Sequence, residues 1–152
     1  MNYLKRLKQS GEFEYSIGAN AEEIKHIEEE LGILLPEAYM DFLSECGSCN
    51  YGDVYINGIY KEKDSISYPI VELTKQLRED LHLSEDFIVL HYEVDEFLTL
   101  YKVSNKIHLK DAKVFEAEVY CNDKGDFEID KPTPMFNSFE EYFEDFLDLA
   151  ED

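Results

Sequence analysis

The chain has 152 residues, of which 35 are Asp or Glu and 14 are Lys or Arg, and its formal net charge is -21. Nucleic acids and anionic lipids are bound through Lys and Arg, so a chain this acidic is excluded from both classes of partner. The charge would instead attract cationic proteins, unless it serves solubility alone.

Two amphipathic helices are predicted in the first third of the chain, after a short N-terminal helix. Asn20 is the N-cap of the first, with Glu23 at its third position, and Gly32 ends it. Pro36 begins the second, which ends at Gly47. The apolar residues of the pair repeat at helical spacing: Ile24, Ile27 and Leu31 in the first, and Tyr39, Phe42, Leu43 and Cys46 in the second.

The spacing of apolar residues changes after these helices. Asn57-Gly58 is the strongest short signal for a type I′ turn, and it predicts a hairpin of residues 53–56 and 59–60. Residues 69–81 return to helical spacing. We therefore expect a hairpin and then a helix in the middle of the chain.

Strands and one helix fill the rest of the chain. Residues 87–90 are a predicted buried strand, which the turn at 93–96 connects to a return strand over 97–101. In residues 115–121 apolar and polar side chains alternate, so we expect one buried face and one solvent-exposed face. Ser138 and Glu141 form a capping box for a C-terminal helix whose apolar stripe docks on the core.

Helices at both ends bracket strands that are mainly connected by hairpins. The predicted fold class is therefore α+β, with a central, largely antiparallel sheet of about five or six strands flanked by N-terminal, middle and C-terminal helices. The length predicts a single domain over residues 1–152.

Localisation is predicted from segments that the sequence lacks. Met1 to Lys8 are followed by no apolar stretch of signal-peptide length, and no run of 18 apolar residues occurs. Three cysteines fit a reducing cytosol and do not make a disulfide framework. We therefore expect a cytoplasmic protein that does not span a membrane.

Motifs for catalysis or cofactor binding are missing. Neither a G-x-x-x-x-G-K-[ST] nor a G-x-G-x-x-G phosphate loop is present, and no G-x-S-x-G marks a nucleophile. The four histidines, His26, His82, His91 and His108, are never spaced to place two imidazoles on one helix face. We predict no enzyme, no catalytic residue, no cofactor and no metal site.

Cys46-Gly47-Ser48-Cys49 has the spacing of paired thiols in redox proteins and zinc knuckles. A zinc site needs four ligands, and Cys121 supplies only a third thiol. Cys46 ends a predicted helix, where the negative end of the helix dipole disfavours a thiolate. We therefore interpret Cys46 as a core residue and Cys49 as a loop residue.

Several features between Ile24 and Gly52 are specific in combination: Ile24 with Ile27 and Glu28, Leu31-Gly32, Leu35-Pro36, Tyr39 and Phe42-Leu43. This combination resembles the signature of the SUKH superfamily, which includes fungal cell-wall synthesis regulators and bacterial toxin-immunity proteins. The resemblance continues through a hairpin at Asp95-Glu96-Phe97 and the helix that begins at Ser138, and it covers the chain from about Ala19. Residues 45–50 depart from the Asn-Gly-Gly type turn of many members.

The resemblance implies an immunity protein that binds and neutralises a cognate toxin, often a nuclease. A nuclease is positively charged where it grips phosphates, so carboxylates could occlude its cleft. An alternative with the same fold is an intracellular regulatory or scaffolding module. An enzyme that uses carboxylates or the two neighbouring thiols is the third class.

Tyrosines beside carboxylates are the best candidates for a protein interface, and the alternative for each is an ordinary solvated surface. They fall into three sets. The first hairpin supplies Tyr51, Asp53, Tyr55, Tyr60 and Glu62, the central turn supplies Tyr92, Glu93, Asp95 and Glu96, and the polar face of the 115–121 strand supplies Glu116, Glu118 and Tyr120.

Overall fold

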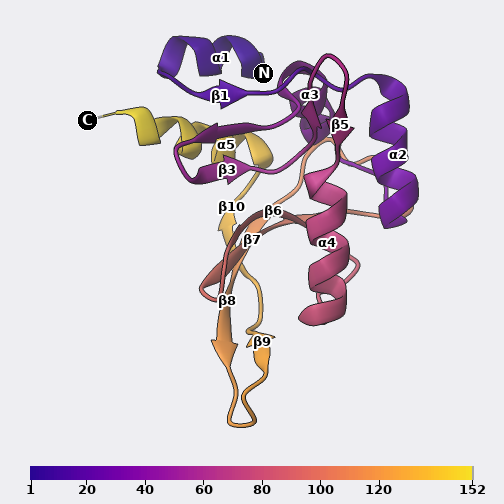
Figure 1. Ribbon diagram of the computed structural model, residues 1–152, viewed down its shortest axis with the longest axis vertical. Helices are drawn as coiled ribbons and strands as arrows, with labels where there is room; N and C mark the ends of the chain where they lie inside the picture. Colours follow the sequence, from indigo (N-terminus) through magenta and orange to yellow (C-terminus); the bar gives the residue numbers. More distant parts are fainter. Residues whose placement is uncertain (152) are drawn as a thin grey trace.

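A computed structural model describes residues 1–151 of the chain (Figure 1). The helices are α1 (Tyr3–Ser10), α2 (Ala21–Leu31), α3 (Glu37–Cys46), α4 (Pro69–Asp80) and α5 (Phe139–Leu147), followed by the 3-10 turn η1 (Asp148–Ala150). The strands are β1 (Glu14–Tyr15), β2 (Cys49–Tyr51), β3 (Val54–Ile56), β4 (Tyr60–Lys61), β5 (Ile66–Ser67), β6 (Phe87–Glu93), β7 (Phe97–Lys102), β8 (Val114–Cys121), β9 (Phe127–Ile129) and β10 (Thr133–Phe136). All pairings between these strands are antiparallel, which confirms the α+β class.

The strands form three sheets. The largest has five strands in the order β10-β8-β7-β6, with β9 paired to the far half of β8. The second contains β1, β2 and β3, and the third contains β4 and β5. In Figure 1 the small sheets lie at one end of the molecule with α1, α3 and α5, and the β8–β9 hairpin extends to the other end.

The boundaries of α2 agree with the sequence. The Asn20 side chain accepts from the Glu23 amide and the Glu23 carboxylate accepts from the Asn20 amide, both at 2.9 Å. Gly32 ends the helix in the left-handed region, at φ 66°. The start of α3 differs by one residue, because Pro36 has an extended backbone and is the N-cap of a helix that begins at Glu37.

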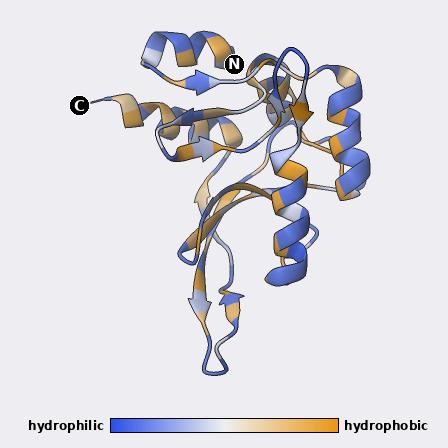
Figure 2. Ribbon diagram, viewed as in Figure 1, coloured by the Kyte–Doolittle hydropathy of each residue, from blue (hydrophilic) through white to orange (hydrophobic). Residues whose placement is uncertain are grey.

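The five-stranded sheet separates two apolar clusters, since neighbouring residues of a strand point to opposite faces. Ile88, Tyr101 and Val114 belong to the larger cluster, which contains the buried faces of α1, α2, α3 and α5. Val89, Leu100 and Ala117 belong to a smaller cluster with Leu77 of α4. Figure 2 shows hydrophobic residues along the middle of this sheet, whereas the tip of the β8–β9 hairpin is hydrophilic.

The hairpin predicted at Asn57-Gly58 is wrong. The hairpin of this region joins β2 to β3 through Gly52 and Asp53, with Gly52 at φ 61°, and β4 pairs with β5. Asn57 instead donates its amide to Leu90 O at 2.8 Å, and Ile59 donates to Gly47 O at 2.9 Å. A Cβ on Gly58 would lie 1.9 Å from Gly47 O, so this glycine permits a close crossing of two segments and not a turn.

Two further details correct the sequence predictions. Cys49 is not a loop residue, because it lies in β2 with 1% of its surface exposed. The alternation of β8 continues only to Val119, and Cys121 is exposed because the strand runs past the edge of the core. Within residues 1–151, no helix is both long and apolar enough to cross a membrane.

Candidate functional site

Two adjacent surface cavities flank α4, and we call them together the α4 groove. The hairpin cavity, of about 500 Å³, is lined by Asn50, Gly52, Asp53, Tyr55, Asn57, Tyr60, Pro69, Glu72, Leu73 and Gln76. The turn cavity, of about 570 Å³, is lined by Gln76, Leu77, Asp80, Leu81, His82, Tyr92, Asp95, Asp126, Phe127 and Glu128. Gln76 lines both, so the two cavities are neighbours along the helix.

The α4 groove is strongly acidic. Asp53 and Glu72 line the hairpin cavity, and four more carboxylates line the turn cavity: Asp80, Asp95, Asp126 and Glu128. None of the lining residues is Lys or Arg. Two other surface hollows of residues 1–151 each contain a lysine, Lys25 in one and Lys110 in the other. A further hollow of residues 1–151 also lacks Lys and Arg, but it has only two carboxylates, Glu93 and Asp145. With six carboxylates, the α4 groove is the better match for a cationic partner.

The sequence of α4 places its polar side chains in this groove. Glu72, Gln76 and Asp80 are four residues apart and share one helix face. The opposite side of the helix packs on the sheet, where Thr74 is fully buried and its hydroxyl accepts from Val89 N at 3.1 Å. The contact with β6 fixes the helix, and so it fixes the direction in which its carboxylates project.

The second wall of the groove is held by tyrosines. The Tyr55 hydroxyl accepts from Tyr92 N and donates to Tyr92 O, both at 3.2 Å, and so attaches the β2–β3 hairpin to β6. The Tyr92 hydroxyl in turn accepts from Asp95 N at 3.4 Å. Asp95 lies in the left-handed region at φ 63°, which Asp tolerates better than most residues.

The structure brings five of the twelve predicted interface residues to this groove. Asp53, Tyr55 and Tyr60 line the hairpin cavity, and Tyr92 and Asp95 line the turn cavity. Tyr55 and Tyr92 are half-buried, so they contribute to the walls more than to the open surface.

Four predicted residues lie on the other face of the large sheet. Strand pairing aligns Glu93 with Phe97 and Glu118, and Thr99 with Glu116, while alternation puts Tyr120 on the same side. His91 faces this side too, with its Nε2 atom 3.2 Å from a Glu93 carboxylate oxygen. This surface is therefore separate from the α4 groove.

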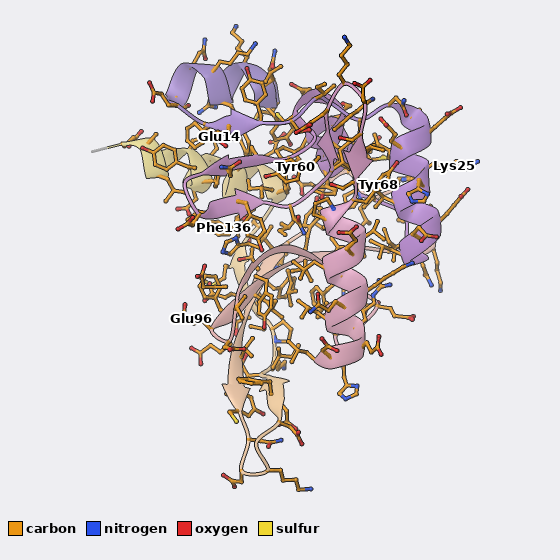
Figure 3. The ribbon with its side chains drawn as sticks, in the orientation of Figure 1. Glu14, Lys25, Tyr60, Tyr68, Glu96 and Phe136 are labelled. Carbon is orange, nitrogen blue, oxygen red and sulfur yellow. The ribbon has the colours of Figure 1, made fainter. Side chains whose placement is uncertain are left out.

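The last three predicted residues, Tyr51, Glu62 and Glu96, are exposed and line neither cavity. The Tyr51 ring packs beside Phe13, with 5.1 Å between ring centroids. Figure 3 labels Tyr60 and Glu96, which lie well apart along the long axis of the molecule. The twelve residues consequently do not form one patch.

Four of the six groove carboxylates, and Gln76, are not predicted from the sequence. Glu72, Gln76 and Asp80 come from the polar side of α4, and Asp126 and Glu128 come from the β8–β9 hairpin. The spacing of four residues in α4 is a readable signal for a shared polar face. The approach of the β8–β9 hairpin to α4 depends on tertiary packing and has no local signal.

The neighbouring thiols are held in the core. Burial raises the pKa of Cys46 to about 12 and raises the pKa of Cys49 well above its ordinary value. A thiol of this kind is a poor nucleophile and a poor metal ligand near neutral pH. In the part of the chain that the structure describes, no group of three or more His, Cys, Asp or Glu is arranged to hold a metal ion.

Comparison with protein families gives a match over nearly the whole chain. The family model SUKH_5, described as SMI1-KNR4 cell-wall, matches residues 2–148. The match confirms the resemblance drawn from residues 24–52, and it extends to α1, which the sequence signature leaves out. No curated protein matches the chain.

Proposed function

Because the chain belongs to the SUKH_5 family, described as SMI1-KNR4 cell-wall, we propose that it is a non-enzymatic immunity protein that binds and neutralises a cognate toxin. The superfamily includes toxin-immunity proteins, and the chain lacks the motifs of the common catalytic sites. We further propose that it acts in the cytoplasm, where its free cysteines stay reduced.

The observation that carries this proposal is the α4 groove, with six carboxylates and no Lys or Arg among its lining residues. A basic nuclease must concentrate positive charge where it binds phosphates. A concave acidic surface can occupy that region and exclude the nucleic acid. The net charge of -21 would also accelerate the encounter of the two proteins by electrostatic steering.

We assign the toxin contact first to the groove residues Asp53, Tyr60, Asp80 and Asp95. The opposite sheet face, with Glu93, Glu116, Glu118 and Tyr120, is the second surface to test. Tyr51, Glu62 and Glu96 are exposed and would contribute at the rim of a large interface.

A second candidate is an intracellular regulatory or scaffolding module of the same fold. The description of the family model refers to the cell wall, which favours such a role for part of the family. The two candidates differ in their partner, because a regulatory module would bind a protein of the same cell without protecting it from a toxin.

Co-expression with the product of the adjacent gene tests the proposal. Growth rescue together with a stable complex on size-exclusion chromatography is the expected result. A complex without rescue would favour the regulatory module, and neither rescue nor a complex would contradict the immunity function.

A further inference from the structure

We propose that the hairpin cavity is an arginine pocket, which receives one guanidinium group of the basic partner. The inference rests on the proposed function for the identity of that partner. To the proposed function it adds that an arginine of the partner is an anchoring side chain, and it names the residues of the chain that bind this arginine.

Asn57 is one of the residues that line the hairpin cavity. The residue is 5% exposed, and three of its four polar groups are occupied. Its backbone amide donates to Leu90 O at 2.8 Å, its carbonyl accepts from the Tyr39 hydroxyl at 2.6 Å, and its carboxamide NH₂ donates to Val89 O at 3.3 Å.

The carboxamide oxygen of Asn57 accepts no hydrogen bond from residues 1–151. Its NH₂ group donates to Val89 O, and Asn57 lines the hairpin cavity. Because this oxygen is not among the fully buried polar atoms that lack a partner, solvent reaches it. The oxygen is therefore a ready acceptor for a donor that enters the hairpin cavity.

Two carboxylates, those of Asp53 and Glu72, also line the hairpin cavity. Asp53 lies in the turn between β2 and β3, and Glu72 lies in the first turn of α4. Neither carboxylate forms an ion pair or accepts a hydrogen bond within residues 1–151. Both therefore keep their acceptor capacity in the cavity that Asn57 also lines.

This arrangement favours arginine over lysine. A guanidinium group carries five N–H donors in a planar fork, whereas an ammonium group is a compact point charge. A planar cation also stacks on aromatic rings, and Tyr55 and Tyr60 supply rings in the cavity lining. At about 500 Å³, the cavity falls in the range of small-ligand sites.

The pocket can be probed without the toxin, by NMR titration with N-acetyl-arginine amide. We expect millimolar binding that shifts the Asn57 carboxamide and the Gly52 and Leu73 amides. The citrulline analogue has the same shape without the charge and should leave these signals unchanged. Equal binding of the lysine analogue would overturn the assignment to a guanidinium group.

Matched variants of α4 locate the site. Glu72→Gln should weaken binding of the arginine amide at least threefold, and the double variant Asp53→Asn with Glu72→Gln at least tenfold. Glu79→Gln makes the same change on the same helix outside the cavity and should have no effect. Equal weakening by Glu79→Gln and Glu72→Gln would reduce the effect to general charge and contradict the pocket.

The two proposals fail in different ways. If only the pocket proposal is wrong, the arginine amide does not bind, while growth rescue and a stable toxin complex are still observed. If only the immunity proposal is wrong, the arginine amide binds at Asn57, but there is no rescue and no complex.

Discussion

The hydroxyl of Tyr55 is bonded to both backbone polar groups of Tyr92, as acceptor from the amide and donor to the carbonyl, each at 3.2 Å. Tyr55 lies in β3 and Tyr92 in β6, so the contact joins two different sheets. Each tyrosine lines one of the two cavities of the α4 groove. The contact therefore supports the groove, and it leaves the Tyr55 hydroxyl with little capacity for a partner.

Replacing Tyr55 by Phe should lower the free energy of unfolding by about 1–2 kcal/mol, because a half-buried pair of backbone groups loses its partner. Urea denaturation monitored by circular dichroism measures this difference. Tyr60→Phe is the control, since Tyr60 is 46% exposed, and should change stability by less than about 0.5 kcal/mol. Equal stability of the two variants would contradict a structural role for the Tyr55 hydroxyl.

Local signals in the sequence predict the helices well. The Asn20 and Glu23 capping box and the stop at Gly32 depend on groups within one or two turns of each other. The Asn57-Gly58 pair gives a wrong prediction because Gly58 allows a close contact with the backbone of Gly47 and does not form a turn. This contact joins the end of α3 to the segment before β4, and the two segments are separate in sequence.

The candidate site is less predictable than the fold for the same reason. Exposed tyrosines and carboxylates identify Asp53, Tyr60 and Asp95, but they do not tell which of them share a surface. Alternation along β6 separates Tyr92 from Glu93, and tertiary packing brings Asp80 to the same cavity as Asp95. The tyrosines and carboxylates that were selected by residue type therefore lie on two different faces of the sheet.

Only one of the three cysteines should react rapidly in the native protein. Cys46 and Cys49 are buried and Cys121 is exposed. A chromogenic disulfide reagent at pH 8 should titrate one thiol in buffer and three in denaturant, and Cys121→Ser should remove the fast thiol. Two fast thiols would show that the pair near the end of α3 is accessible.

The buried thiols also predict a loss of stability in alkali. The pKa of Cys46 is raised by burial to about 12, above its unfolded value of about 8.5. The neutral thiol is favoured in the folded state, so its contribution is complete below about pH 8.5 and is lost as the pH rises toward 12. Cys46→Ala should flatten the decline in stability above about pH 8.5, while it lowers stability at pH 7 by leaving a cavity.

Glu23 predicts a pH dependence of the opposite sign. Burial raises its pKa, but the hydrogen bonds from Lys61 at 2.8 Å and from the Asn20 amide, with the Lys61 charge, outweigh burial and leave the pKa lowered. The ionised carboxylate is favoured in the folded state, so its contribution is present above about pH 4.3 and is lost as the pH falls further.

We expect Glu23→Gln to destabilise the protein by about 1 kcal/mol at pH 7, with a difference from the original protein that shrinks below about pH 4.3. Glu22→Gln is the matched control, because Glu22 is exposed in the same helical turn and accepts no side-chain hydrogen bond within residues 1–151. Chemical denaturation at a series of pH values measures both variants. A difference that is constant down to pH 3 would exclude an ionic role for Glu23.

Neutralising the groove tests where a basic partner binds. The triple variant Asp53→Asn, Asp80→Asn and Asp95→Asn removes three groove charges, and Asn is tolerated at the left-handed backbone of position 95. The control variant Glu12→Gln, Asp64→Asn and Asp123→Asn removes the same charge from exposed residues outside both cavities. Both variants have the same net charge, so a difference between them reports the location of the binding surface.

We expect the groove variant to weaken the affinity for the cognate toxin at least tenfold, which is about 1.4 kcal/mol, and the control variant less than threefold. Calorimetric titration at 0.15 M salt is the appropriate measurement, because charges more than about 8 Å from the partner are then largely screened. At low salt both variants should slow association, since steering depends on the net charge. Equal affinities of the two variants at 0.15 M salt would move the contact away from α4, with the sheet face of Glu93 and Glu116 as the next surface to neutralise.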